Sequence, residues 1–386
     1  MFNNLKTAFE DKSDSDLNRA YFLFKTISNP LISKTLTTLV KTAMWLHLPI
    51  DKIIKATVYK HFCGGTTIED SNNTIQKLWK FKIGTILDFS AEGKESEKDF
   101  NKVMQETIES IKKAKETNSI PFSVFKPTGL TRFTLLEKMS ANIKLSKEEE
   151  KEKIDFEKRV EKICQTSSDN KIPVFIDAEE SWIQDAIDNL VIKMMGKYNA
   201  NQALIFNTLQ LYRKDRIKHL EKLIEKAKLK KFFIGLKLVR GAYHEKEVKR
   251  AKEMNYLCPV HKIKADTDKD YNKALKICIN NIDIVSICAG THNEESSALL
   301  VKLLSSKNIS KNDKKIYFSQ LLGMSDNISY NIASQGYNVA KYVPYGPVKD
   351  VLPYLIRRAN ENTSISGQMG RELSNIIAEK KRRKKS

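Results

Sequence analysis

The pattern that decides the fold is clearest in residues 232–243, which read Phe232-Phe233-Ile234-Gly235-Leu236-Lys237-Leu238-Val239 and then Arg240-Gly241-Ala242-Tyr243. The first eight residues are rich in apolar side chains that favour a buried strand. A cation and a glycine then end the run, at a point where strand gives way to helix. This stretch therefore predicts a strand that delivers polar groups to its carboxyl end.

The same rhythm recurs along the chain from Gly84 onward. Eight short β-prone runs lie at residues 85–89, 122–126, 174–177, 203–206, 232–239, 282–287, 316–319 and 338–342. Amphipathic helical patterns lie between them, as at residues 97–117, 182–196, 213–228 and 294–305. Eight alternations of strand and helix predict an α/β fold with parallel strands, a distorted (βα)8 barrel of the TIM type. An open doubly wound sheet is the alternative, although no Gly-x-Gly-x-x-Gly follows the first run.

The two ends of the chain have a different character. Residues up to about Trp79 show apolar residues at three- and four-residue spacing, which predicts a helical arm over 1–82. The barrel is expected over 83–372. Residues 373–386 contain Lys380-Lys381-Arg382-Arg383-Lys384-Lys385, a block of like charges that predicts a disordered basic tail.

Composition limits the cellular context. The formal net charge of +20 over 386 residues favours an acidic partner, either nucleic acid or an anionic membrane surface, unless it reflects compositional drift toward lysine. No apolar stretch is long enough for a spanning helix, and no secretory signal opens the chain. The five scattered cysteines lack metal-ligand spacing, so no metal site is expected. We therefore expect a cytoplasmic protein, with any membrane contact peripheral and on the inner face.

Polar side chains gather where the predicted strands end. They are Lys126, Asp177, Lys237 with Arg240, Thr291-His292-Asn293, and Tyr342. In a closed barrel, loops at the carboxyl ends of the strands build the active site. Each residue alone is most often a solvated loop or cap residue, but their convergence indicates a site. Lys237, Arg240 and Tyr243 are suited to an anionic or redox-active ring; a phosphate-bearing ligand or a lysine Schiff base would use similar residues.

A second cationic motif follows the last predicted strand. Arg357 and Arg358 lie in a helical run, with Glu361 three or four residues further on. Guanidinium groups match a carboxylate with two hydrogen bonds, and the helix dipole disfavours cations near a helix start. This pair therefore predicts an anion clamp for a small carboxylate.

Several ordered segments together resemble the flavin-dependent proline dehydrogenases. They are residues 175–180, 237–243, 291–294, 321–324 and 342–346, leading into Tyr354 to Asn362. The resemblance spans about Gly84 to Asn362 and implies a barrel that holds FAD. It implies oxidation of L-proline to Δ1-pyrroline-5-carboxylate, the first step of proline catabolism to glutamate, with electrons passed to a respiratory membrane quinone.

The resemblance also implies roles for individual residues. Arg357 and Arg358 would bind the proline carboxylate, supported by Lys126 and Glu361, while Leu321 and Tyr342 would pack against the proline ring. Asp177 and Lys237 would take the catalytic positions near flavin and substrate. The remaining cofactor contacts would come from Gln210, Lys237, Arg240, Gly241, Ala242, Thr291 and His292.

Three further expectations complete the prediction. The chain ends soon after the arginine motif, so we expect a single-function enzyme whose product is oxidised by a separate pyrroline-5-carboxylate dehydrogenase. The basic surface suits contact with an anionic membrane. A nucleic-acid-binding or scaffold protein and a Schiff-base lyase are the competing classes, but no nucleic-acid-binding motif is present, so no nucleic acid partner is expected.

Overall fold

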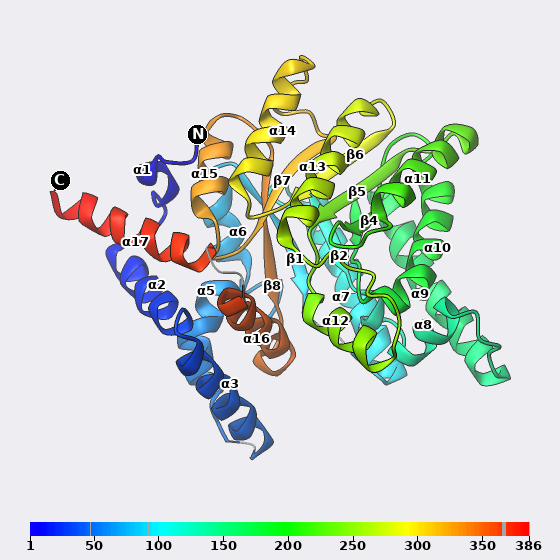
Figure 1. The fold of residues 1–386 in the computed structure, drawn as a ribbon, viewed down its shortest axis with the longest axis horizontal. Helices are drawn as coiled ribbons and strands as arrows, with labels where there is room; N and C mark the ends of the chain where they lie inside the picture. Colours follow the sequence, from blue (N-terminus) through cyan, green and yellow to red (C-terminus); the bar gives the residue numbers. More distant parts are fainter. Residues whose placement is uncertain (47, 91–92, 365–367, 386) are drawn as a thin grey trace. The chain divides into compact units, whose positions relative to one another are not determined.

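A computed structural model describes residues 1–46, 48–90, 93–364 and 368–385; within these ranges the side chains of residues 30, 41, 44, 359–364 and 368–369 are not described. Its eight parallel strands form a closed barrel in the order of the chain (Figure 1). The strands are β1 (Ile83–Phe89), β2 (Phe122–Phe125), β3 (Val174–Ile176), β4 (Ile205–Gln210), β5 (Ile234–Val239), β6 (Val285–Gly290), β7 (Ile316–Leu321) and β8 (Val339–Tyr345). The predicted barrel is confirmed, and each predicted β-prone run overlaps one strand.

Helices connect successive strands, as the alternating pattern predicts. They are α7 (Glu97–Lys115), α8 (Phe133–Ser140), α9 (Lys147–Asn170), α10 (Ser181–Tyr198), α11 (Arg216–Lys230), α12 (His244–Glu253), α13 (Lys264–Asn280), α14 (Glu294–Ser306) and α15 (Asp326–Ser334), with a 3₁₀ turn at Pro127–Gly129. Three of them begin at a side-chain cap, namely α7 at Ser96, α9 at Ser146 and α14 at Asn293. At α9 the Ser146 hydroxyl oxygen accepts from the Glu149 N–H at 3.2 Å, and the Glu149 carboxylate accepts from the Ser146 N–H at 3.0 Å, which forms a capping box.

The chain divides into two compact units. Residues 91–319 form the central unit, and residues 1–90 with 320–386 form the terminal unit. This division differs from the predicted boundaries at 82 and 372, because β1 and β8 pair along their whole length and belong to the same unit as the helices of both chain ends.

In the central unit the strands are aligned by a buried polar side chain. The Asn199 amide donates to the carbonyls of Ile205 and Phe233 at 2.9 and 3.0 Å, and its oxygen accepts from Leu204 and Ile205. One residue thereby sets the starts of β4 and β5. This alignment fixes where their carboxyl ends present side chains.

The terminal unit contains the helical arm. Besides α15, the described helices of this unit are α1 (Leu5–Ala8), α2 (Asp14–Ile27), α3 (Pro30–Trp45), α4 (Asp51–Ile54), a π-helical turn (Lys55–Tyr59), α5 (Lys60–Phe62), α6 (Asn72–Trp79), α16 (Val348–Ser364) and α17 (Gln368–Lys385). Figure 1 shows the blue α2 beside the red α17, although they lie at opposite ends of the sequence. Within the described ranges, no helix combines the length and apolar character needed to cross a membrane.

The prediction of a disordered basic tail is corrected by α17. Ile376 and Glu379 are buried in this helix. Arg382 and Arg383 donate to Glu379 at 2.7 and 2.8 Å, and Arg383 also pairs with Asp14 of α2 at 2.9 Å. These carboxylates balance part of the positive block, so the chain folds where its charge pattern alone predicts disorder.

Candidate active site

Asp177 and Lys237 form a buried ion pair in the central unit. Asp177 directly follows β3, and its backbone N–H donates to the Phe125 carbonyl at 3.0 Å. Lys237, in β5, donates from Nζ to Asp177 Oδ1 and lies 5.5 Å from the centre of the Phe175 ring. The two residues predicted as catalytic are therefore in contact, and each compensates the buried charge of the other.

Aromatic side chains fill the space next to this pair. The rings of Phe122 and Phe175 stack at 4.4 Å between centres, and Phe206 packs edge-on against Phe175 at 5.4 Å. Gly235 makes room for this packing, because a Cβ atom there would lie 2.5 Å from the Phe206 ring. The ion pair is thus bordered by a close-packed apolar layer, as is usual in such barrels.

Gln210 joins the loops that follow β3 and β5. Its amide nitrogen donates to the Glu179 carbonyl at 2.6 Å, and its amide oxygen accepts from the Ala242 N–H at 3.1 Å. Gly241 has a φ of +137°, and a Cβ atom there would lie 2.5 Å from the Tyr212 ring. Only glycine fits this turn. Gln210, Gly241 and Ala242, all predicted to contact a cofactor, therefore lie together at the end of β5.

Arg240 is held by a hydrogen-bond network beyond β5. Its guanidinium donates to Asp268 at 2.6 Å, to Thr291 Oγ1 at 2.5 Å and to Ser296 Oγ at 2.9 Å, and it stacks 4.4 Å from the Tyr271 ring centre. The predicted neighbours Arg240 and Thr291 are therefore in direct contact. Because several partners hold this side chain, Arg240 is fixed in position before any ligand binds.

Two further predicted residues lie at strand ends of the same unit. Lys126 follows β2 and is half-buried, and the loop it opens is fixed by Glu179, which accepts from the backbone and hydroxyl of Thr128 at 2.8 and 2.9 Å. His292 is half-buried between Thr291 and Asn293, the cap of α14. The sequence places Glu179 in a characteristic segment but does not reveal this bond.

The terminal unit holds the residues predicted to contact substrate other than Lys126. Leu321 ends β7, and Tyr342 is buried in β8. The N–H of Leu322 donates to the Tyr342 carbonyl at 2.9 Å. The two predicted ring contacts are thus close in space.

The predicted arginine clamp lies in α16. Arg357 is half-buried and Arg358 is buried, with the Arg358 guanidinium 5.3 Å from the Tyr354 ring centre. The Glu361 side chain lies outside the described residues. The two arginines lie on a helix, as predicted. Their expected position near its start is wrong, because α16 begins at Val348 and both arginines lie in its interior, where the dipole argument does not apply.

Comparison with known proteins decides the family. The family model for proline dehydrogenase matches residues 71–371. The chain belongs to the proline dehydrogenase family. It is 32% identical to proline dehydrogenase 1, mitochondrial, of Dictyostelium discoideum, over 97% of this chain and 74% of the relative. It is 33% identical to the carbapenem antibiotics biosynthesis protein CarD of Pectobacterium carotovorum, over 81% of this chain and 80% of that protein.

A solved structure supports the fold. Proline utilization A (PutA) from Bdellovibrio bacteriovorus, inactivated by N-propargylglycine, superposes with a TM-score of 0.74 at 19% identity. The match covers 94% of this chain and 38% of the solved chain. Membership of the proline dehydrogenase family makes the protein an oxidoreductase that acts on proline.

A buried charge network in the terminal unit was not predicted from the sequence. Lys341 donates to Asp326 at 2.7 Å and to the Met324 carbonyl at 2.5 Å, while Lys12 lies 3.3 Å from Asp326. Glu372 accepts the Ser325 N–H at 2.7 Å. These residues lie far apart in the sequence. The local signal was Lys341 itself, because a lysine inside an apolar strand must find partners.

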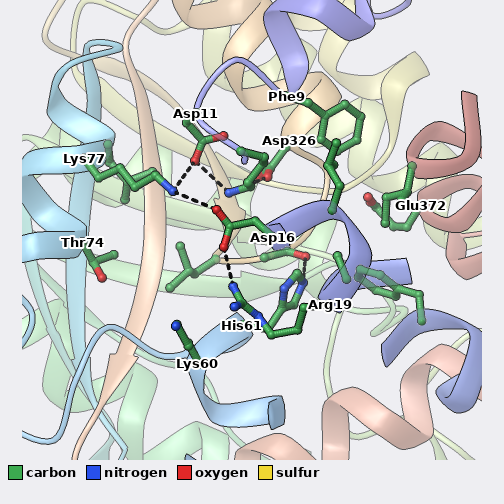
Figure 2. A pocket seen from close by; sticks show the side chains of 18 of the residues that line it. Phe9, Asp11, Asp16, Arg19, Lys60, His61, Thr74, Lys77, Asp326 and Glu372 are labelled. Atoms are coloured by element: carbon green, nitrogen blue, oxygen red, sulfur yellow. Dashed lines mark hydrogen bonds and ion pairs between the residues drawn. The ribbon is translucent and has the colours of Figure 1, made fainter. Parts of the chain in front are cut away.

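A cavity of about 120 Å³ adjoins this network, and its lining includes Asp326 and Glu372 (Figure 2). His61 also lines it, with Nε2 2.9 Å from the Gly323 carbonyl. Burial, reinforced by the nearby Lys12, lowers the pKa of His61 to about 4. The neutral imidazole donates to Gly323 and so holds the loop that follows β7.

Proposed function

We propose that the protein oxidises L-proline to Δ1-pyrroline-5-carboxylate with bound FAD. The observation that carries this proposal is the buried Lys237–Asp177 pair at the strand ends, beside loops joined by Gln210. A flavin gains negative charge when it is reduced, and a nearby cation or N–H donor accommodates that charge. Lys237 supplies such a cation, and Asp177 holds it in place.

The residues around this pair fit a polar ring system. Thr208 is the strand partner of Lys237, and its hydroxyl is buried with no hydrogen-bond partner among the described residues. Such an orphaned group favours a ligand or water at this point. We propose that FAD contacts Lys237 and Gln210, with Arg240, Gly241, Ala242, Thr291 and His292 lining the rest of its site.

When bound, FAD would accept the hydride that leaves the proline carbon next to nitrogen. The work of the protein is then alignment, together with binding of the unprotonated amine. We propose that Arg357 and Arg358 bind the proline carboxylate and thereby orient the ring. Tyr342 and Leu321 are proposed to pack against that ring, while Lys126 and Glu361 keep their predicted supporting roles.

The electrons are proposed to pass to a membrane quinone, and the product to a separate pyrroline-5-carboxylate dehydrogenase. Such an acceptor requires the enzyme to visit a membrane surface. A formal net charge of +20 supports contact with anionic lipid. The cytoplasmic location, peripheral to the membrane, stays a prediction.

The visible absorbance spectrum of the purified protein, followed by anaerobic addition of L-proline, tests the proposal. We expect flavin bands that bleach with L-proline. If no flavin binds even after reconstitution with FAD, the cofactor assignment is wrong. If flavin binds and does not bleach, the substrate assignment is wrong.

A further inference from the structure

Helix α3 turns its large apolar side chains to solvent. Leu31 is 78% exposed, Leu39 58% and Trp45 77%, whereas Ser33 is only 4% exposed. Ile32, Leu36 and Leu46 are also exposed, and together with Leu39 they recur at the spacing of one helix face. A normal surface helix buries its apolar face, whereas α3 exposes these side chains and packs Val40 against the core on its inner side.

The exposed apolar surface continues past the end of α3. Leu48, which follows α3, and Ile53 of α4 are exposed as well. Figure 1 shows α3 projecting away from α2 and α16, the helices of its own unit that it contacts. Single exposed apolar residues are normal, but a contiguous apolar patch marks an interaction surface.

The charge around this patch matches an anionic partner. Residues 17–50 contain no aspartate or glutamate, and the one acidic residue between α3 and Lys55 is the exposed Asp51 at the start of α4. Lys34 lies on α3, and Lys52 and Lys55 follow it; all three side chains are exposed. A helix that combines an apolar face, flanking lysines and a terminal tryptophan is typical of a segment that lies in the interface of a bilayer.

The hydroxyl groups near this face do not oppose its transfer into lipid. Thr35 donates to the Leu31 carbonyl at 2.9 Å, and Thr38 donates to the Lys34 carbonyl at 3.0 Å. Thr57, beyond Ile53, donates to the Ile53 carbonyl in the same way at 2.7 Å. These donors are satisfied inside the helix, so the face can leave water without an unpaired hydroxyl proton.

We propose that α3, together with Leu48 and with Ile53 of α4, forms a membrane-docking surface, with α3 lying in the plane of an anionic bilayer. The apolar face from Ile32 to Leu46 enters the boundary between headgroups and acyl chains, and the lysines contact anionic headgroups. The physiological meaning of this docking rests on the proposed quinone acceptor. The binding itself does not depend on proline oxidation, so the two proposals fail separately.

Co-sedimentation of the full-length protein with vesicles tests the docking. The vesicles contain either phosphatidylcholine alone or an equal mixture with phosphatidylglycerol. We expect binding to the mixed vesicles that weakens with salt but is not abolished, because the apolar part of the interaction is insensitive to screening. Absence of binding to the mixed vesicles at low salt overturns the proposal.

Substitution of the apolar face distinguishes vesicle binding through α3 from binding through the overall positive charge of the protein. The triple variant Leu36→Ser, Leu39→Ser, Leu46→Ser keeps every charge and should lower vesicle partitioning by about tenfold or more. The matched control is Leu229→Ser, Leu257→Ser, which removes exposed leucines of the central unit and should bind like the unchanged protein. Equal loss in both variants, or no loss in the triple variant, contradicts the assignment to α3.

Fluorescence of Trp45 distinguishes lipid from a second copy of the chain. In a background with Trp79→Phe and Trp182→Phe, Trp45 emission should shift to the blue on vesicle addition and be quenched by brominated acyl chains. Light scattering without lipid should give the same mass for the unchanged protein and the triple variant. A dimer that dissociates in the triple variant would instead assign α3 to self-association and overturn the proposal.

Discussion

Glu372 offers a direct test of the buried charge network in the terminal unit. This glutamate is buried in α17, where its carboxylate accepts from the Ser325 backbone at 2.7 Å. Burial, reinforced by the nearby Asp326 carboxylate, raises the pKa of Glu372 from 4.5 to about 7. Burial opposes ionisation of Asp326 too, but Lys12 and Lys341 outweigh it and hold the pKa of Asp326 low.

The raised pKa makes the free energy of unfolding depend on pH. Between pH 4.5 and 7 the folded state keeps the Glu372 proton that the unfolded state releases. The stability that this group contributes is therefore complete below pH 4.5 and is lost as pH rises through 7. Each pKa unit corresponds to about 1.4 kcal/mol, so ionised Glu372 lowers the stability of the folded protein by about 3 kcal/mol at most.

Glu372→Gln removes this titration and keeps an oxygen for the Ser325 bond. The free energy of unfolding of the variant, relative to the unchanged protein, should rise between pH 5 and pH 8 by up to about 3 kcal/mol. Urea unfolding of both proteins across this range measures the difference. Other titrating groups are shared by the two proteins and cancel.

Glu379→Gln, in the same helix, is the matched control. Burial would raise the pKa of Glu379, but Arg382 and Arg383 lower it, so its carboxylate stabilises the folded state at neutral pH. This variant should be less stable than the unchanged protein, with no gain between pH 5 and pH 8. A Glu372→Gln difference that stays flat over this range would refute the account of the network.

Three further outcomes are expected. Arg357→Ala should raise the KM for proline by about 10- to 100-fold and leave flavin content unchanged, which steady-state kinetics and the absorbance spectrum measure; an unchanged KM would contradict the clamp. Gly241→Ala should lower the free energy of unfolding by about 1–3 kcal/mol more than Gly336→Ala does, because both glycines have positive φ but, of the two, only Gly241 faces an aromatic ring. Thermal unfolding compares the two variants, and equal losses would contradict the contact with Tyr212. Lys341→Met should cost about 3–5 kcal/mol in urea unfolding, because it leaves Asp326 short of a partner, and adding Asp326→Asn should restore part of it.

The fold could be predicted because its signal is local and repeated. The run 232–239 was expected as a strand, and β5 occupies Ile234–Val239 within it. Polar residues directly follow several strands, namely Lys126 after β2, Asp177 after β3, Arg240 after β5 and Thr291 after β6, so closure of the barrel gathers those groups at one end. Asp177 directly follows β3 and Lys237 lies in the last half of β5, so only β4 separates their strands and the long lysine side chain reaches the carboxylate.

The buried charge network could not be predicted in the same way. Lys12, Asp326, Lys341 and Glu372 belong to four separate segments, and no spacing in the sequence links them. The prediction of a disordered tail was wrong for a related reason. Its block of like charges predicts disorder, but Glu379 inside the helix and Asp14 near the other end of the chain supply the opposite charge.

The network and the predicted substrate contacts are linked through β8. Lys341 and Tyr342 are consecutive in this strand, so their side chains point to opposite faces. Lys341 donates to the Met324 carbonyl and Glu372 accepts from Ser325, so both hold the loop that Leu321 begins. Leu322, in turn, donates to the Tyr342 carbonyl. The position of the predicted ring contacts therefore depends on charges on the opposite face of the strand. A change in the charge of Glu372 should then alter the KM for proline before it unfolds the protein.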